Sequence, residues 1–232
     1  MTDPPAATRS LSVLIPVHNE ERTLERVLDA VESRPEVSEI VLVNDGSTDA
    51  TRQILEARTF SVPTQVIHHE RNRGKGNAIR TAINAATSDL ALIQDADLEY
   101  DPSDYPLLLA PFARPGVTVV YGTRTFTSHT AYSFYFVLGN RLVNLWSNVL
   151  YNTYLSDLET GFKVMSLASW RSLDLRSDGF ELEPEITAKL LRRGHRIYEV
   201  PISYAARSRE EGKKLTWMDG VKAIWTLARL RI

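Results

Sequence analysis

Short apolar runs alternate with segments of helical periodicity along the first half of the chain. Between Glu20 and Glu32, apolar residues recur at the spacing of one helix face, at Leu24, Val27, Leu28 and Val31. The same patterns predict helices at 49–57 and 76–86, and strands at four apolar runs: Leu11–Val17, Glu39–Val43, Gln65–His68 and Leu90–Gln94. Because apolar strands alternate with amphipathic helices, we expect an α/β fold whose central, mostly parallel sheet is flanked by helices.

The second half carries longer and more apolar helical patterns. We expect a strand at Val117–Tyr121 and a strand interrupted at Pro201, and helices at three further segments: Ala131–Tyr154, Glu183–Arg193 and Trp217–Arg229. In the first of these helices the polar residues form one narrow stripe: Asn140, Arg141, Asn144, Ser147 and Asn148. The remaining apolar surface exceeds what one helix usually buries, which favours a membrane surface, a homodimer or burial in the core.

Composition narrows the class of protein. The chain has 232 residues, of which 43% are hydrophobic and 24% charged, enough for one domain over residues 10–232 after a loose tail at 1–9. Its net charge of −2 argues against bulk nucleic-acid binding, and with no cysteine it has no thiolate metal site or cysteine nucleophile. We find no secretory signal and no apolar run of the ~20 residues that span a membrane. We therefore expect a cytoplasmic protein that has at most a peripheral contact with a membrane.

Polar clusters follow three of the predicted parallel strands. They are Pro16–Glu20, Asn44–Ser47 and Gln94–Asp97, and within them Asn19 is a candidate N-cap for one helix and Ser47 or Thr48 for the next. In such sheets ligands bind beyond the carboxyl ends of the strands, so these clusters are expected to converge at one edge.

The pair Asp95 and Asp97 is the most informative of these clusters. Magnesium and manganese prefer oxygen ligands, and magnesium typically takes one or two carboxylates together with substrate phosphates. The pair therefore predicts a divalent cation that holds a diphosphate. The alternative is an acidic turn that caps a helix.

Other candidates each have a structural alternative. Asp45 can accept hydrogen bonds from a base or ribose, or form an Asx-turn. Gly74 and Lys75 stand at a helix start that favours an anion, although neither a P-loop nor a dinucleotide fingerprint is present. Arg207 and Lys213 lie in a basic segment that can neutralise a diphosphate or form a solvated surface.

Two acidic groups in the second half can supply a general base. One is the segment 157–163, which begins with Asp157, and the other is Glu181, Glu183 and Glu185. Acidic residues in a first helical turn are also favoured by the helix dipole. Among the histidines, only His18 lies in a cluster that points to a ligand.

These clusters, in this order, resemble family 2 glycosyltransferases of the GT-A fold, in particular the dolichol-phosphate mannosyltransferase-like and other polyprenyl-phosphate glycosyltransferases. The motifs that carry the resemblance are residues 16–20, 43–47, 72–76, 95–97, 121–124 and 199–202, with Arg207 and Gly212-Lys213. The resemblance implies a Rossmann-like sheet. It also implies a nucleotide-binding half at 10–120 and a helical acceptor half at 121–232 that ends in an amphipathic helix.

The resemblance also assigns roles by position. Residues that match those holding the nucleotide sugar are Pro16, His18, Glu20, Val43, Asp45, Gly74, Lys75, Asp95, Ala96, Asp97, Arg207 and Lys213. Those that match metal positions are Asp95, Asp97 and Glu99. Arg124 and Arg141 match cations near an acceptor phosphate, and Asp157 matches an acidic residue near the reacting carbon. With Glu183, Asp157 and Arg124 form the expected catalytic set.

The resulting hypothesis is a hexosyl transfer with inversion from a UDP- or GDP-sugar, assisted by Mg²⁺ or Mn²⁺. A polyprenyl or dolichyl phosphate acceptor is already ionised at neutral pH and needs cations rather than a base. A soluble sugar or small-molecule hydroxyl would instead need Asp157 or Glu183 as base. A non-catalytic nucleotide-sugar-binding module is the alternative from another class. A nucleotidyltransferase is a further one, although its glycine-rich signature is absent from Leu11–Glu20.

Overall fold

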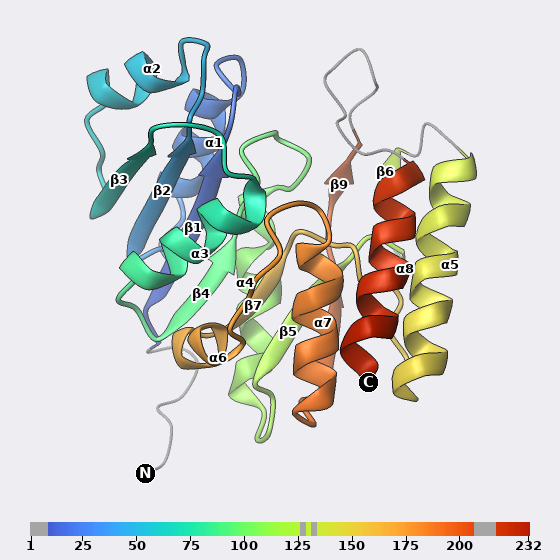
Figure 1. Ribbon diagram of the computed structural model, residues 1–232. Coiled ribbons are helices and arrows are strands. Elements are labelled where there is room, and N and C mark those ends of the chain that lie inside the picture. Colours follow the sequence, from blue (N-terminus) through green and yellow to red (C-terminus); the bar gives the residue numbers. More distant parts are fainter. Residues whose placement is uncertain (1–8, 126–128, 131–133, 207–216) are drawn as a thin grey trace.

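The computed structural model describes residues 9–125, 129–130, 134–206 and 217–232 (Figure 1). Within them, seven strands form one sheet in the order β3-β2-β1-β4-β7-β5-β8. The strands are β1 (Leu11–Val17), β2 (Glu39–Asp45), β3 (Thr64–His69), β4 (Leu90–Ile93), β5 (Val119–Thr123), β7 (Lys163–Ser166) and β8 (Ile197–Pro201). Neighbours are parallel except at β7, which is antiparallel to both β4 and β5. The predicted mostly parallel sheet is confirmed, and β7 is a strand that the sequence patterns did not predict.

Helices cover the sheet and extend beyond it. They are α1 (Leu24–Glu32), α2 (Thr51–Ala57), α3 (Lys75–Ala85), α4 (Tyr105–Leu109), α5 (Phe134–Tyr151), α6 (Leu167–Ser172), α7 (Leu182–Arg192) and α8 (Trp217–Arg231). Short 3-10 turns at Pro102–Asp104 and Ala110–Ala113 flank α4, and β6 (His129–Thr130) pairs with β9 (Tyr204–Ala205). Figure 1 shows α7, α8 and α5 standing side by side in the second half of the chain. The predicted tail falls almost wholly on residues 1–8, outside the described residues.

Apolar residues of the strands alternate between two cores, one on each face of the sheet. Val13 and Ile15 of β1 belong to the core that also contains Leu28 of α1. Leu14, between them in sequence, belongs to the opposite core with Ile79 of α3. Truncating one such buried side chain to alanine typically costs about 2–5 kcal/mol. These two cores fix the carboxyl edge of the sheet, where the polar clusters lie.

The loops after β1 and β2 differ from the predicted helix caps. Helix α1 begins at Leu24, and Asn19 has a φ of 57° and does not cap it. The Asn19 side chain instead accepts a hydrogen bond from the backbone N–H of Thr48 at 2.8 Å. Ser47 Oγ in turn accepts from the Asn19 N–H at 3.0 Å, and α2 begins only at Thr51. The prediction of Asn19, Ser47 or Thr48 as caps was therefore wrong, because these polar groups tie the two loops together.

Helix α5 buries Asn144 and Ser147 of its polar stripe against the protein, whereas Arg141 is exposed. Asn144 is buried and bridges two backbone groups, donating to the Ser156 carbonyl and accepting from the Leu158 N–H, each at 2.8 Å. Ser147 is also buried, whereas Leu145 and Val149 are exposed. Burial of the whole apolar surface in the core, one of the expected alternatives, is thus wrong for this helix. Among the described residues, no helix is both long and apolar enough to cross a bilayer.

Candidate active site

The structure brings the polar clusters that follow β1, β2 and β4 together. Strand β1 lies between β2 and β4, so the three carboxyl ends meet at one edge. His18 Nδ1 lies 2.9 Å from the carbonyl oxygen of Asp45, which fixes Nδ1 as the donor. Thr23 Oγ1 donates to the carbonyl of Ala96 at 2.7 Å and to Glu20 Oε2 at 3.1 Å. The predicted convergence of these clusters is therefore present in the fold.

Asp45 is a positioning residue in this structure. Its side chain is nearly inaccessible, and the carboxylate accepts from the N–H groups of Arg73 and Gly74, at 2.8 Å for Gly74. His69 Nδ1 lies 2.7 Å from its Oδ1. In this loop the side chain of Asn44, rather than that of Asp45, accepts from a nearby backbone group, the Ser47 N–H three residues on. A contact between Asp45 and a nucleoside stays a prediction, as does one for Pro16 and for Val43, which lies in the core.

The glycines before α3 make room for backbone rather than for a phosphate. Gly74 has a φ of 94°, and a Cβ there would lie 2.3 Å from the carbonyl oxygen of Asp178. A Cβ on Gly76 would lie 2.0 Å from the carbonyl oxygen of Ser177, and the Gly76 N–H already donates to Asp178. The close approach of segment 177–178 explains both glycines. The helix-start alternative thus accounts for Gly74 here, and its contact with a donor stays a prediction.

Lys75 links the carboxyl edge of the sheet to helix α7 in the second half of the chain. Its Nζ lies 2.8 Å from Asp95 Oδ1 and 3.0 Å from Glu183 Oε1 at the start of α7. Burial lowers the pKa of Lys75, but the charges of Asp95 and Glu183 outweigh it and hold that pKa well above its ordinary value. Lys75 is therefore a permanent cation that joins two carboxylates predicted independently from the sequence.

Asp95 and Asp97 fit a divalent cation that keeps substrate phosphates among its ligands. Asp97 Oδ1 accepts from the Glu99 N–H at 3.1 Å, the turn contact that the alternative predicted, and Glu99 Oε2 accepts from the Tyr204 hydroxyl at 2.9 Å. The described part of the chain contains no group of three histidine or acidic residues arranged to hold a metal. One or two carboxylates suffice for a Mg²⁺ or Mn²⁺ that also binds a diphosphate. Glu99 as a third ligand stays a prediction.

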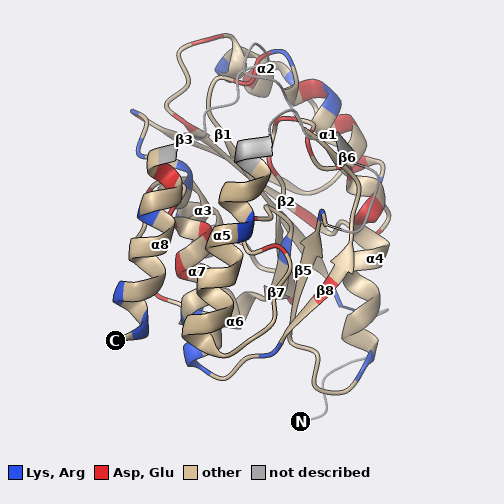
Figure 2. Cartoon of the chain, turned by 90° about the vertical axis from the view of Figure 1, so that its right-hand side faces the viewer, with Lys and Arg blue, Asp and Glu red and all other residues tan. Residues whose placement is uncertain are grey.

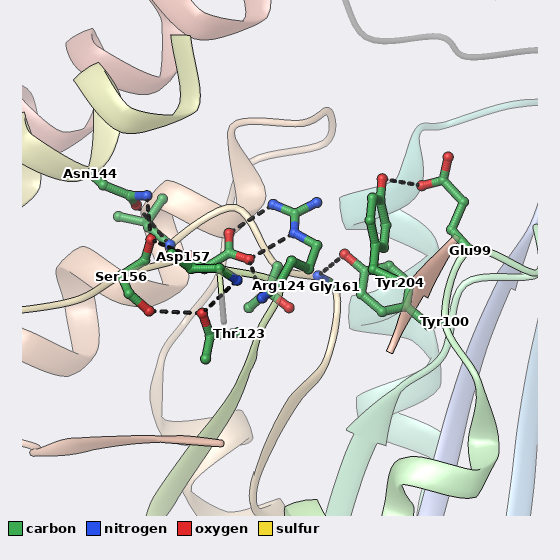
Figure 3. A network of polar contacts seen from close by, with 12 residues as sticks. Glu99, Tyr100, Thr123, Arg124, Asn144, Ser156, Asp157, Gly161 and Tyr204 are labelled. Atoms are coloured by element: carbon green, nitrogen blue, oxygen red, sulfur yellow. Dashed lines mark hydrogen bonds and ion pairs between the residues drawn. The ribbon is translucent and has the colours of Figure 1, made fainter. Parts of the chain in front are cut away.

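Arg124 and Asp157 form a buried, two-pronged ion pair (Figure 3). Nε and Nη2 of Arg124 each lie 2.7 Å from a carboxylate oxygen of Asp157, and the Arg124 N–H donates to Oδ2. The guanidinium also lies over the Tyr204 ring, 4.9 Å from its centroid. Glu199 holds the Asp157 backbone N–H. The two residues predicted near the acceptor and the reacting carbon thus neutralise each other.

The remaining predicted residues are separate from this group. Arg141 is exposed on α5, where it can meet an acceptor phosphate only if the acceptor extends to that helix. Arg207 and Lys213 lie outside the described residues. Their roles stay predictions.

Sequence reasoning did not single out Glu159 and Thr160. The loop that carries them passes close to Asp95, because a Cβ on Gly161 would lie 2.7 Å from Asp95 Oδ2. Glu159 Oε1 and Thr160 Oγ1 are buried without a hydrogen-bond partner. Burial and the nearby charge of Glu183 raise the pKa of Glu159 to about 7. The only signal in the sequence was an acidic segment before a glycine, which does not say which carboxylate lacks a partner.

Solved structures share this fold. A crystal structure of glucosyl-3-phosphoglycerate synthase from Mycobacterium tuberculosis, in complex with Mn²⁺, UDP and phosphoglyceric acid, superposes with a TM-score of 0.74. The match covers 97% of this chain and 79% of that chain at 21% sequence identity. The fold is that of the GT-A glycosyltransferases.

The sequence comparison is more specific than the fold. The model of Glycosyl transferase family 2 matches residues 12–167, and the chain belongs to this family. Dodecaprenyl-phosphate galacturonate synthase of Rhizobium johnstonii is 33% identical over 131 residues, which are 53% of this chain and 38% of that protein. Undecaprenyl-phosphate mannosyltransferase of Micrococcus luteus is 26% identical over 220 residues, covering 86% of this chain and 85% of that protein. The chain thus spans well under two thirds of the first relative.

Proposed function

We propose that the chain transfers a hexose with inversion from a UDP- or GDP-sugar to a polyprenyl phosphate. The observation that carries this proposal is the link from Asp95 through Lys75 to Glu183, which joins the donor edge to the acceptor half. Two relatives are named for polyprenyl-phosphate sugars, which supports the acceptor. A structural neighbour was solved in complex with UDP and Mn²⁺, which supports the donor.

The donor is proposed to bind with its diphosphate at Asp95 and Asp97. Mg²⁺ or Mn²⁺ on these carboxylates would supply positive charge to the departing diphosphate. Asp45 holds the Arg73–Gly74 turn against β2, and that turn positions Lys75 toward Asp95. In this arrangement Lys75 keeps the Asp95 carboxylate oriented before the donor arrives.

The Arg124–Asp157 pair favours a phosphate acceptor. A phosphate monoester is largely dianionic at neutral pH, so it attacks without a base and needs cations that orient it. Asp157 is occupied by Arg124 and is poorly placed to remove a proton. Nε and Nη2 of Arg124 face Asp157, and the other guanidinium hydrogens can donate to an acceptor phosphate.

An apolar surface on α5 and α8 suits a lipid acceptor at a membrane. We call it the α5–α8 apolar face; its exposed residues are Leu138, Leu142, Leu145, Trp146, Val149, Met218, Val221, Ile224 and Trp225. Trp146 Nε1 donates to the Ile224 carbonyl at 3.3 Å, so the two helices adjoin. Figure 2 shows that most positions along these two helices are uncharged, with Lys and Arg at several positions and an acidic residue near the start of α8. Exposed Arg141 and Lys222 favour anionic lipid, and we propose peripheral membrane contact here.

A soluble hydroxyl acceptor is the second candidate. Glu183 Oε2 is buried without a hydrogen-bond partner, so one oxygen of this carboxylate is available to take a proton from a hydroxyl. The structural neighbour in complex with phosphoglyceric acid is consistent with a small acceptor.

The test is a transfer assay with radiolabelled UDP-glucose, UDP-galactose and GDP-mannose, each with Mg²⁺ or Mn²⁺. Undecaprenyl phosphate in detergent, dolichyl phosphate in detergent and 3-phosphoglycerate are offered as acceptors. We expect label in the lipid fraction, lost in Asp97→Asn and kept in Asp101→Asn, because Asp101 only caps a turn through a contact that asparagine can also make. Label only in a soluble product favours the second candidate. Donor binding without transfer or hydrolysis would identify a binding module and contradict the proposal.

A further inference from the structure

Three buried oxygens without hydrogen-bond partners belong to one region of the acceptor half. They are Glu159 Oε1, Thr160 Oγ1 and Glu183 Oε2. Thr160 is fully buried and Glu183 is 6% exposed. Buried polar atoms are nearly always paired in folded proteins, and an unpaired one calls for an explanation such as a missing ligand. These three atoms therefore mark a place built to receive hydrogen-bond donors.

The two carboxylates act on each other. Burial and then the charge of Glu183 raise the pKa of Glu159, while Lys163, Arg124 and Asp157 are the other charged groups that act on it. Lys163 lies beneath the same loop, where its Nζ donates to the carbonyls of Leu158 and Thr160. The loop from 157 to 161 and the start of α7 thus present their acidic groups to one region.

Two neighbouring carboxylates, Glu185 and Glu199, have hydrogen-bond partners on both oxygens, in contrast to Glu159 and Glu183. Glu185, one half-turn along α7 from Glu183, accepts from the N–H groups of Arg176 and Ser177 and pairs with Lys189. Glu199 accepts from the N–H groups of Ser156 and Asp157. Position at the start of α7 or near Asp157 therefore does not by itself leave a carboxylate oxygen unpaired.

The region adjoins the proposed diphosphate position on two sides. Lys75 connects Glu183 directly to Asp95, and Gly161, next to Thr160, lies against Asp95 Oδ2. In a nucleoside-diphosphate sugar the hexose is bonded directly to the terminal phosphate. A diphosphate at Asp95 and Asp97 therefore places the hexose within reach of Glu159, Thr160 and Glu183.

The chemistry of the region favours hydroxyl groups over a second cation. The unpaired carboxylate oxygens accept hydrogen bonds, and a hexose ring carries several O–H donors. A second cation would be repelled by the ammonium of Lys163, which lies beneath the loop that carries Glu159 and Thr160. Hydroxyl donors also satisfy the oxygens without adding charge to a buried site.

We propose that Glu159, Thr160 and Glu183 recognise the ring hydroxyls of the transferred hexose, and this rests on the proposed function. The predicted donors are hexoses with free ring hydroxyls. A deoxy analogue leaves a buried acceptor unpaired and should bind at least tenfold more weakly, because sites that hydrogen-bond a substrate hydroxyl discriminate strongly against its absence.

The test measures binding rather than turnover. Calorimetric titrations in Mn²⁺ compare UDP with UDP-glucose and GDP with GDP-mannose, and the ratio of the two dissociation constants reports the contribution of the sugar. We expect Glu159→Gln and Thr160→Val to bind the diphosphate as the wild type does and to lose about tenfold in affinity for the sugar nucleotide. Thr160→Ser should keep that affinity, and Glu25→Gln, an exposed residue of α1, is the matched control.

Deoxy donors complete the cycle. The 2-, 3-, 4- and 6-deoxy forms of the preferred donor are titrated into the wild type and into Glu159→Gln. One of them should bind the wild type at least tenfold more weakly than the parent donor does. Glu159→Gln should bind that deoxy form and the parent donor with equal affinity. Unchanged sugar-nucleotide affinity in folded Glu159→Gln and Thr160→Val overturns this inference and leaves the proposed function standing. A wild type that binds none of the diphosphates contradicts both.

Discussion

In the first half of the chain, the buried carboxylate of Asp45 receives hydrogen bonds from two backbone N–H groups and from His69. In the second half, which is proposed to bind the acceptor, Glu159 and Glu183 each keep a buried oxygen without a hydrogen-bond partner. The first arrangement holds a turn in place and leaves little for a ligand to satisfy. The unpaired oxygens of the second arrangement cost folding free energy. A ligand that donates hydrogen bonds to them removes that cost and is bound more tightly.

The same contrast holds for apolar side chains. Among the described residues of the first half, Leu107 is the exposed large apolar residue, whereas nearly all others lie on the α5–α8 apolar face. The first half of the chain therefore buries nearly all of its large apolar side chains within the fold. The second half leaves an apolar face exposed, and a lipid acceptor is proposed to bind there.

Asp157→Asn tests a satisfied carboxylate and should have the largest effect. Removing its charge leaves the buried guanidinium of Arg124 without a counter-ion, which typically costs about 3–5 kcal/mol. Urea unfolding measures the loss. The control is Asp174→Asn, whose ion pair with Arg176 is exposed and should contribute less than about 1 kcal/mol. Equal losses in the two variants would show that the buried pair does not stabilise the acceptor half.

Glu183→Gln and Glu185→Gln separate the two kinds of carboxylate on one helix. Glu183→Gln should lower the transfer rate about a hundredfold, which corresponds to roughly 2.7 kcal/mol in the activation barrier. The substitution weakens the ion pair with Lys75 and removes the charge of a carboxylate that is proposed to face the donor. Glu185→Gln should instead lower the unfolding free energy by about 2 kcal/mol, since it weakens charged hydrogen bonds to Arg176 and Ser177. Transfer kinetics and urea unfolding are measured for both variants. A loss of stability in Glu183→Gln together with a loss of activity in Glu185→Gln would contradict the comparison.

Glu159→Gln should stabilise the protein above neutral pH. The folded-state pKa of about 7 lies above the ordinary 4.5, so the folded protein binds this proton more tightly and loses stability as the pH rises through that interval. Glutamine carries no charge, so at pH 8 the variant should gain up to about 3 kcal/mol, with little difference at pH 4. Urea unfolding at both values measures this. A variant less stable than wild type at pH 8 would mean that the Glu159 carboxylate is satisfied.

Substitutions on the α5–α8 apolar face should have the smallest effect. Val149 and Trp225 are both well exposed, so changing both to serine should alter the unfolding free energy by less than about 0.5 kcal/mol. Binding to vesicles containing phosphatidylglycerol should fall about tenfold, as measured by co-sedimentation. Leu107→Ser, exposed on α4, should leave vesicle binding unchanged. A wild-type dimer that the double substitution dissociates would instead assign the face to a second copy of the chain.

The regular half of the fold was predictable because its forces are local in sequence. The period of Leu24, Val27, Leu28 and Val31 marks the helix face that packs on β1, and apolar runs mark the parallel strands. Strand β7 was missed because Lys163–Ser166 is short and pairs with strands far away in sequence. The stripe on α5 was visible, but the pattern alone did not reveal that Asn144 and Ser147 face inward.

The candidate site was predictable at the level of segments. The acidic pair after β4 and the acidic start of α7 stand out as motifs, and Lys75 joins them in the fold. Which carboxylate is satisfied depends on backbone N–H groups supplied by other segments. The Asp45 carboxylate accepts hydrogen bonds from the turn at Arg73, whereas one oxygen of Glu159 has no hydrogen-bond partner. The residues next to Asp45 and Glu159 in the sequence do not specify this difference.

The most direct test of the central claim is metal-dependent binding of a nucleoside diphosphate at Asp95 and Asp97. UDP and GDP are titrated by calorimetry into the wild type, Asp97→Asn and the control Asp101→Asn, with Mn²⁺ and then with EDTA. The account predicts that the wild type and Asp101→Asn bind one of the two at least tenfold more tightly with Mn²⁺, and that Asp97→Asn loses this gain. Mn²⁺-dependent binding that survives intact in Asp97→Asn, or no binding by the wild type, would contradict it.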